Sequence, residues 1–378
     1  MIRGRDYMQF QKLSDLLDSF LEIGIPGVDC VVYQDHEEVF RHRAGYSDLE
    51  QKLPITGKET YFLFSCSKVV TCAAALTLLE RGKFLLTDPL AAYIPEFSEM
   101  VLTNGEKAKT EIKIRDLFTM SAGFTYDIAS PSITQVIREK DGRATTLDVV
   151  RAIAKEPLSF EPGTHWQYSL CHDVLAGLVE VVSGKRFGEY VTETIFEPLG
   201  MTKTSFGVSD KNKKQLAPLY RFNDETNRPE LQKSECIYTL TPEYDCGGAG
   251  MVSCTDDYIL FADALANGGV GKNGSRILSP ATVDLMRTNC LEGAALTDLN
   301  WIQHTGYGYG LGVRTMIDRA KGGAIGPVGE FGWGGAAGSY VLIDPNSRTA
   351  LFYCQHMLNN KEPYTHPRLR NVLYACVD

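Results

Sequence analysis

Apolar residues near the start of the chain follow first a helical and then a strand-like spacing. From Met8 to Ile23 they recur on one face of a helix, and Gly24-Ile25-Pro26-Gly27 ends that pattern. The runs 28–33 and 38–46 are rich in β-branched and aromatic residues and enclose an acidic turn, which predicts a hairpin. The chain is therefore predicted to open with an amphipathic helix followed by strands.

The middle of the chain is predicted to be mainly helical. A helix that is apolar nearly all round runs from Ser65 to Arg81 and stops at Gly82. Helical patterns then recur between loops that carry Pro and Gly; they cover residues 114–121, 146–155, 171–183 and 187–195. We interpret the stretch from about 85 to 230 as a helical insert.

Strand patterns return near the C-terminus. Residues 339–344 and 348–355 are predicted strands joined by a turn at Pro345-Asn346-Ser347, and a short helix is expected from about Pro367. A helix and strands at both ends of the chain predict one α/β unit assembled from the two termini.

These elements suggest a division into two domains. Residues 1–84 and 231–378 would form a discontinuous α/β sheet domain, and residues 85–230 a mainly helical domain. We expect the active site to lie between the two.

Composition and charge narrow the classes of function. The 378 residues are 44% hydrophobic, which is typical of a globular protein, and carry a formal net charge of -9 without any basic run. Nucleic acid is therefore not an expected partner. The longest apolar stretch, around 72–79, is far shorter than the roughly 20 residues that span a bilayer. No apolar signal segment follows Met1, so we expect a soluble, cytoplasmic protein with no membrane partner.

Cysteine and histidine usage gives no support for disulfides or metals. The 10 cysteines form no C-x-x-C pair, and the 7 histidines show no spacing typical of zinc ligands. We interpret the cysteines as small buried hydrophobes in a reducing cytoplasm. No metal and no cofactor is expected.

The segment Ser65-Cys66-Ser67-Lys68 is the sharpest chemical feature. Serine and lysine three residues apart on a helix share a face, so the amine of Lys68 can reach the hydroxyl of Ser65. The first turn of a helix also favours developing negative charge. A plain alternative is that Ser65 caps the helix while Lys68 extends its amine to water.

Two further elements could line a site. Tyr168, in Tyr168-Ser169-Leu170, stands at the entrance of the helix predicted from about Cys171, where its phenol could point into a cleft or simply fill a packing gap. Gly332-Trp333-Gly334-Gly335-Ala336 precedes the strand 339–344, where missing side chains could let a substrate approach backbone N–H groups. The alternative for the glycine segment is a β-bulge or tight turn.

Together these elements resemble the serine β-lactamase and penicillin-binding-protein-like hydrolases, and within them the esterases related to class C β-lactamases (family VIII-type carboxylesterases). Almost the whole chain takes part. The further stretches with close counterparts in that family are 79–89, 114–124, 196–201, 247–253 and 309–312. The resemblance implies the β-lactamase/transpeptidase-like fold, classed as α/β (α+β), with an antiparallel sheet flanked by N- and C-terminal helices plus a helical second domain.

The resemblance also implies roles for particular residues. Ser65 would be the acylated nucleophile, Lys68 and Tyr168 would share the acid and base work, and the N–H groups of Ser65 and Ala336 would form the oxyanion hole. Trp333, Gly334, Gly335 and Leu170 would contact the substrate. The mechanism that this implies needs no metal.

Departures from the family pattern bear on the substrate. β-Lactamases and peptidases of the family carry Asn two residues after the tyrosine, where this chain has Leu170. Their Lys-Thr-Gly strand motif is replaced by Trp333-Gly334-Gly335, which removes the cation that would meet a substrate carboxylate. Both changes are similar to the carboxylesterase branch.

Three other candidate features are set aside. His304-Thr305-Gly306 has the form of a strand motif found in some relatives, but it precedes the segment 309–312 that the motif should follow, so His304 is interpreted as a loop residue. No G-x-S-x-G is present, which argues against an α/β-hydrolase. Cys66 has no basic partner at local spacing and is interpreted as structural.

The leading hypothesis is a serine hydrolase that cleaves small carboxylic esters through an acyl-enzyme. One alternative is a β-lactamase or D-Ala-peptide hydrolase in which other residues replace the missing Asn and Lys. The other is a non-catalytic penicillin-binding-like protein. A small ester or β-lactam-like molecule is the expected partner, and the oligomeric state is left open.

Overall fold

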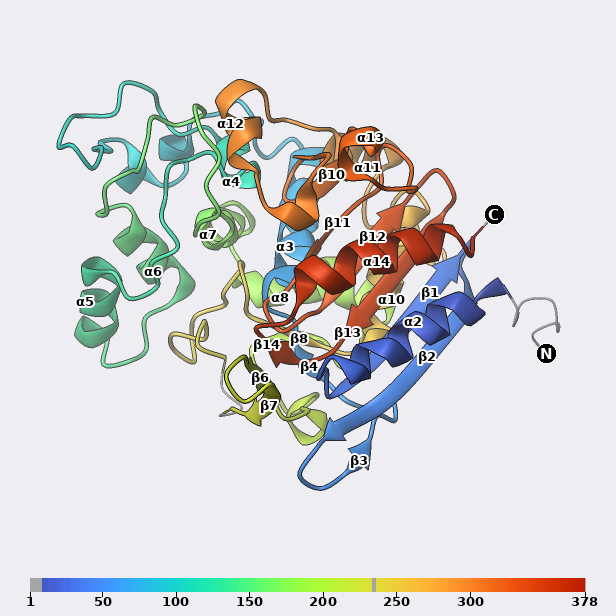
Figure 1. Ribbon diagram of the computed structural model, residues 1–378. Coiled ribbons are helices and arrows are strands. Elements are labelled where there is room, and N and C mark those ends of the chain that lie inside the picture. Colours follow the sequence, from blue (N-terminus) through green and yellow to red (C-terminus); the bar gives the residue numbers. More distant parts are fainter. Residues whose placement is uncertain (1–8, 233–235, 378) are drawn as a thin grey trace.

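A computed structural model describes residues 9–232 and 236–377 (Figure 1). Its main feature is an eight-stranded sheet in the order β3-β2-β1-β13-β12-β11-β10-β9, in which every neighbouring pair is antiparallel. The strands are β1 (Gly27–Gln34), β2 (Glu37–Asp48), β3 (Leu53–Pro54), β9 (Tyr307–Tyr309), β10 (Arg314–Met316), β11 (Phe331–Gly334), β12 (Tyr340–Asp344) and β13 (Thr349–Cys354). The N-terminal hairpin and the C-terminal strands thus share one sheet, because β1 pairs with β13.

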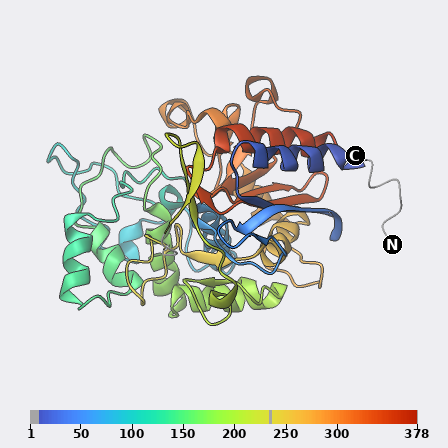
Figure 2. The same cartoon turned by 60° about the horizontal axis from the view of Figure 1, so that its bottom comes forward.

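One face of this sheet is covered by the two terminal helices. Helix α2 (Gln11–Glu22) lies beside α14 (Glu362–Tyr374), as both views show (Figures 1 and 2). The expected start of the first helix at Met8 lies outside the described residues. The last helix begins before Pro367 and contains that proline. Pro363 lies in the first turn of α14, where backbone N–H groups have no partner within the helix, so this proline is compatible with the start of the helix.

The opposite face carries the larger core. Helix α10 (Thr255–Ala266) packs on β13 and β1, and α3 (Ser67–Glu80) packs on α7 (Cys171–Ser183). Nearly every residue of α3 is buried, as its all-round apolar sequence predicts. The predicted α/β fold with an antiparallel sheet flanked by N- and C-terminal helices is confirmed.

The stretch 85–230 is helical in its first part only. Its helices are α4 (Ile114–Phe118), α5 (Pro131–Glu139), α6 (Thr146–Ile153), α7, α8 (Phe187–Val191) and α9 (Glu197–Leu199), with the π-helical turn η4 (Thr192–Phe196) between the last two. Short strands follow, namely β5 (Ser205–Phe206), β6 (Tyr220–Asn223) and β7 (Arg228–Leu231). Two of them pair with strands outside the stretch, because β5 joins β8 (Met251–Ser253) and β6 joins β14 (Met357–Leu358), and β7 pairs with β6. The division into domains at residues 84/85 and 230/231 stays a prediction.

The remaining elements are short connections. They are η1 (Phe64–Cys66), η2 (Leu90–Ala92), η3 (Pro95–Phe97), η5 (Lys213–Gln215), η6 (Ile302–His304), β4 (Tyr61–Phe62), α11 (Pro280–Arg287), α12 (Gly293–Asp298) and α13 (Arg319–Gly322). None of the helices in the described segments is long and apolar enough to cross a membrane. Every cysteine is unpaired, and all but Cys290 are buried, as expected for small core residues.

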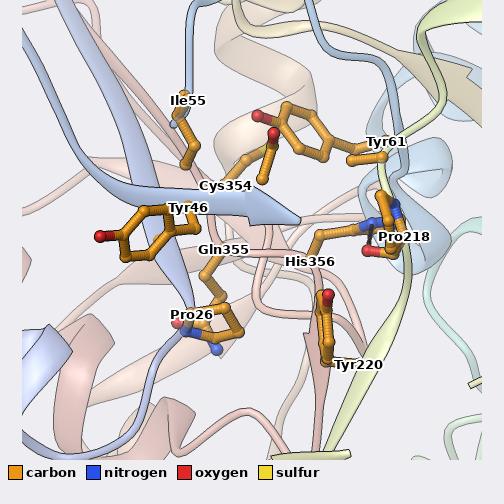
Figure 3. A pocket seen from close by; sticks show the side chains of 12 residues that line it. Pro26, Tyr46, Ile55, Tyr61, Pro218, Tyr220, Cys354, Gln355 and His356 are labelled. Carbon is orange, nitrogen blue, oxygen red and sulfur yellow. Dashed lines mark hydrogen bonds between the residues drawn. The ribbon is translucent and has the colours of Figure 1, made fainter. Parts of the chain in front are cut away.

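A buried histidine ties β4 to the C-terminal part of the fold. His356 lies beside Pro218 (Figure 3), and its backbone φ of 49° is in the left-handed region. The N–H of Phe62 donates to its Nε2 at 3.1 Å, so Nδ1 carries the proton and donates to the carbonyl of Pro218 at 3.0 Å. Burial lowers the pKa of His356 to about 4, although the bond to Pro218 opposes that shift.

Acid should therefore destabilise the protein through His356. Its pKa is lower in the folded chain than the ordinary value near 6.5. Between pH 6.5 and 4 the unfolded chain therefore binds a proton that the folded chain does not, and folding stability decreases as the pH is lowered. We expect the loss attributable to His356 to reach about 3 kcal/mol by pH 4. The measurement is urea unfolding at pH 7, 5.5 and 4 for the wild type and for His356→Gln.

The glutamine variant should be less stable at pH 7, because two hydrogen bonds are disturbed, and the gap should narrow as the pH falls. His172, whose pKa burial lowers to about 3, titrates in both proteins and cancels in the comparison. A gap that stays constant from pH 7 to 4 would show that His356 does not take part in acid unfolding.

Candidate active site

A sharp backbone turn presents Ser65 at the start of α3. Strand β4 pairs with β8, and the N–H of Leu63 continues this pairing to the carbonyl of Met251 at 3.0 Å. Phe64 then adopts a φ of 46°, which is strained for a residue with a side chain. Ser65 lies in the turn η1 and is partly exposed, whereas its two neighbours in the chain are buried.

The helix itself begins at Ser67, two positions later than its predicted start at Ser65. A 3₁₀ turn fills the difference, because the left-handed Phe64 lets the chain tighten before the regular helix starts. Ser65 therefore does not cap α3, whose N-cap residue is Cys66.

Lys68 is fully buried and points toward Ser65. Its Nζ lies 3.3 Å from Ser65 Oγ and donates to the carbonyl of Gly248 at 2.7 Å. The alternative in which this lysine extends to water is wrong, because its side chain has no exposed surface. A buried ammonium is costly unless polar atoms surround it, and here those atoms belong to Ser65, Gly248 and Tyr126.

Two stacked tyrosines form the next layer around Lys68. The ring centroid of Tyr168 lies 4.5 Å from Lys68 Nζ, a cation–π distance. Tyr126 stacks on Tyr168 with ring centroids 5.3 Å apart, and its hydroxyl lies 3.2 Å from Lys68 Nζ. Burial raises the pKa of Tyr126 well above its ordinary value, so this phenol stays neutral.

Sequence reasoning missed Tyr126. It follows the stretch 114–124 that carries the family resemblance, and a lone loop tyrosine has no spacing that marks it. The one local sign is Gly123, whose φ of 93° turns the chain back toward the core.

The hairpin between β11 and β12 closes against the turn that holds Ser65. The Ser339 hydroxyl donates to the carbonyl of Leu63 at 2.9 Å. A side chain at Gly335 would begin 2.2 Å from that same carbonyl oxygen, so only glycine fits. Asn360 holds the tip by donating to the carbonyls of Gly335 at 3.1 Å and Ala336 at 3.0 Å.

The N–H groups of Ser65 and Ala336 are available at this junction. Among the residues that the structure describes, none accepts a hydrogen bond from either of them. Ala336 is exposed at the tip of the hairpin, and Ser65 lies beside the Leu63 carbonyl that the hairpin contacts. Such paired donors can stabilise a negatively charged oxygen.

All three tryptophans of the chain gather beside Tyr168. Trp333 stacks on Tyr168 with centroids 5.7 Å apart and donates from Nε1 to its hydroxyl at 3.3 Å. Trp301 packs edge-on against Tyr168 and also against Trp166. Trp333 is only 2% exposed, so the cluster holds the Tyr168 ring in place and offers an apolar wall around it.

The other sequence candidates lie behind this wall or beside it. Leu170 is 4% exposed and is the N-cap residue of α7, and Gly334 is partly exposed on β11. His304 is buried in η6 rather than on a loop, with its ring 4.9 Å from that of Trp333. Burial raises the pKa of Cys66 to about 12, which keeps its thiol protonated and agrees with a structural role.

The geometry suits nucleophilic chemistry on a carbonyl group. A partly exposed hydroxyl is in contact with a buried amine, the ring of Tyr168 faces that amine, and the N–H groups of Ser65 and Ala336 have no acceptor among the described residues. Within the described part of the chain, no cluster of three or more His, Cys, Asp or Glu side chains could hold a metal ion.

Comparison with known proteins places the chain in one family. The family model described as Beta-lactamase matches residues 10–375. Protein Rv1367c of Mycobacterium tuberculosis is 30% identical over 344 residues, which cover 87% of this chain and 85% of that protein. Esterase EstB of Burkholderia gladioli is 28% identical over 355 residues, covering 88% of this chain and 86% of the esterase.

A solved structure gives the same result. The hydrolase EstCE1, described as having promiscuous acyltransferase activity, is 26% identical and superposes with a TM-score of 0.82 over 98% of this chain and 99% of its own. The β-lactamase/transpeptidase-like fold implied by the sequence is confirmed. The chain belongs to the Beta-lactamase family and is a serine hydrolase.

Proposed function

We propose that this protein hydrolyses small carboxylic esters through an acyl-enzyme formed on Ser65. The observation that carries the proposal is the contact between a partly exposed hydroxyl and a fully buried amine, 3.3 Å apart at Ser65 and Lys68. The similarity to an esterase and to a hydrolase with acyltransferase activity supports ester chemistry.

In the first half of the reaction, Ser65 Oγ attacks the ester carbonyl carbon. Lys68 and Tyr168 share the transfer of the Ser65 proton, and the tetrahedral intermediate then expels the alcohol, whose oxygen takes that proton. The N–H groups of Ser65 and Ala336 hold the carbonyl oxygen while it carries negative charge. Water then attacks the acyl carbon, and Lys68 and Tyr168 pass a proton from the water to Ser65 Oγ as the carboxylic acid product leaves.

The strand that borders the site supports this substrate class. Strand β11 has the sequence Phe-Gly-Trp-Gly and carries no cation that could pair with a substrate carboxylate. Its tryptophan is turned into the aromatic cluster against Tyr168. An anionic substrate therefore finds no charge-assisted hydrogen bond at β11, whereas the binding of a neutral acyl group does not depend on such a bond.

Neutral esters should accordingly be better substrates than anionic β-lactams. We expect the kcat/KM for a short-chain nitrophenyl ester to exceed that for a chromogenic cephalosporin by tenfold or more, since the missing bond is worth roughly 1.5–3 kcal/mol. The measurement is initial rates with both substrates on one preparation.

Two outcomes would contradict the esterase proposal. Faster turnover of the cephalosporin would favour a β-lactamase or D-Ala-peptide hydrolase. Failure to turn over either substrate, with no covalent adduct on Ser65, would favour a non-catalytic binding protein.

The cysteines bear on where this reaction takes place. All ten are unpaired, and nine of them are buried. Free thiols persist in reducing compartments, which supports our proposal of a cytoplasmic enzyme acting on a small-molecule substrate.

A further inference from the structure

Behind Lys68, helix α7 buries an acidic side chain that the proposed reaction does not use. Asp173 has no exposed surface. Its Oδ1 accepts hydrogen bonds from the Tyr244 hydroxyl at 2.6 Å, the Cys246 thiol at 3.1 Å and the Gly248 N–H at 3.3 Å. Its Oδ2 is buried as well, and none of the residues 9–232 and 236–377 donates to it. A buried carboxylate oxygen without a donor is costly, so a compensating interaction is expected nearby.

Gly248 connects this carboxylate to Lys68. The N–H of Gly248 donates to Asp173 Oδ1, and the carbonyl of the same residue accepts from Lys68 Nζ at 2.7 Å. A side chain at Gly248 would begin 2.6 Å from Asp173 Oδ2 and 3.4 Å from Lys68 Nζ. The carboxylate and the ammonium therefore border the same small gap, and glycine keeps that gap open.

In this arrangement the Lys68 amine can contact Ser65 while it stays under the influence of the Asp173 charge. Because the gap and the Gly248 residue stand between the charges, the amine remains free to contact Ser65 at 3.3 Å instead of forming a close ion pair. A negative charge at this range in a dry interior still attracts the amine electrostatically. Leu170, at the start of the same helix, has no polar side-chain atom that could contact the amine.

We propose that Asp173 is a positioning residue for the reaction at Ser65, acting through Lys68. Its charge faces the Lys68 amine across the gap, and its bond to the Gly248 N–H fixes the carbonyl that orients that amine. The inference rests on the proposed function, in which Lys68 moves protons for Ser65.

Other titratable groups face this pair from every neighbouring element. Those around Lys68 are Cys66, Cys72, Tyr126, Tyr168, His172 and Cys246. Those around Asp173 also include Cys171, Tyr238 and Tyr244. Burial raises the pKa of the thiols and of Tyr126, Tyr238 and Tyr244, and lowers that of His172 to about 3, so these groups stay uncharged near neutral pH.

The test is the pH dependence of Ser65 acylation in Asp173→Asn. A fluorophosphonate probe reports acylation without knowledge of the natural substrate, and its rate is measured from pH 5 to 10. We expect the pH profile of Asp173→Asn to shift to lower pH by about one unit or more, because the substitution removes a negative charge beside the site. Asp257→Asn is the matched control, since Asp257 is also buried but bonds to Lys203 N–H and Thr204 instead.

The outcomes separate this inference from the proposed function. A wild-type protein that does not react at Ser65 would overturn the proposed function itself. A reactive wild type with an unshifted Asp173→Asn profile, or with a slower but unshifted one, would overturn the role of the Asp173 charge. Should Asp173→Asn fail to fold, Asp173→Ser is measured in the same way, and its profile decides on the same criterion.

Discussion

Replacing Ser65 with alanine should reduce ester turnover by about 10⁴-fold or more, because the acyl-enzyme can no longer form. Ser65 is the hydroxyl that meets Lys68 Nζ at 3.3 Å while remaining partly exposed. The measurement combines initial rates on a nitrophenyl ester with mass spectrometry after fluorophosphonate treatment. The wild type should carry one adduct per chain on the peptide that contains Ser65, and Ser65→Ala should carry none.

A remote serine provides the matched control. Ser132 lies on α5 and bonds to Glu156, so Ser132→Ala should keep both the rate and the single adduct. Labelling that persists in Ser65→Ala would sink the assignment of the nucleophile. An adduct on the peptide around Ser339 would instead place the reactive hydroxyl in the β11–β12 hairpin.

The parts of the fold and site that were predictable depend on short-range patterns. Lys68 faces Ser65 because three residues of helical chain bring them together, whatever the rest of the fold does. The C-terminal strands, predicted at 339–344 and 348–355, lie at Tyr340–Asp344 and Thr349–Cys354, because alternation and turn residues are local signals. These local signals predicted the centre of the candidate site.

The parts that were missed depend on contacts between distant segments. Tyr126 meets Lys68 across 58 positions of sequence, and Gly248 meets it across 180. Neither side of such a contact carries a spacing that marks it, and only the packing of the loop before α5 and the loop before β8 on α3 brings them together. Asn360, which holds the carbonyl of Ala336, was missed for the same reason.

Short strands were the other weak point. Strands β5, β6 and β7 span two to four residues each, which is too short for alternation to be recognised, and all begin in a stretch predicted to be helical. Trp333 shows a related limit. Its position ahead of the strand 339–344 was predicted, but its burial against Tyr168 follows from the way three tryptophans from separate loops and strands pack together.

Replacing Lys68 with methionine tests what the buried amine does. Methionine keeps the length and apolar volume of the side chain but removes the ammonium and its contacts with Ser65 and Gly248. We expect the rate of Ser65 acylation to fall by about 10³-fold, the range that positioned acid and base groups supply. Tyr126→Phe is the control, because it removes only one of the three polar contacts of Lys68 and should cost less than tenfold.

The stability of the same variant gives an independent reading. A fully buried ammonium is costly to desolvate, so Lys68→Met should raise the free energy of unfolding by about 1–3 kcal/mol even as it removes activity. Urea unfolding and the acylation rate, measured on one preparation, distinguish the possibilities. A variant that acylates more slowly but has a higher free energy of unfolding means that Lys68 serves the reaction and not the stability of the fold. A variant that is less stable and still acylates within tenfold of the wild type means that the amine holds the loop of Gly248 in place, and that the proton of Ser65 leaves by another route.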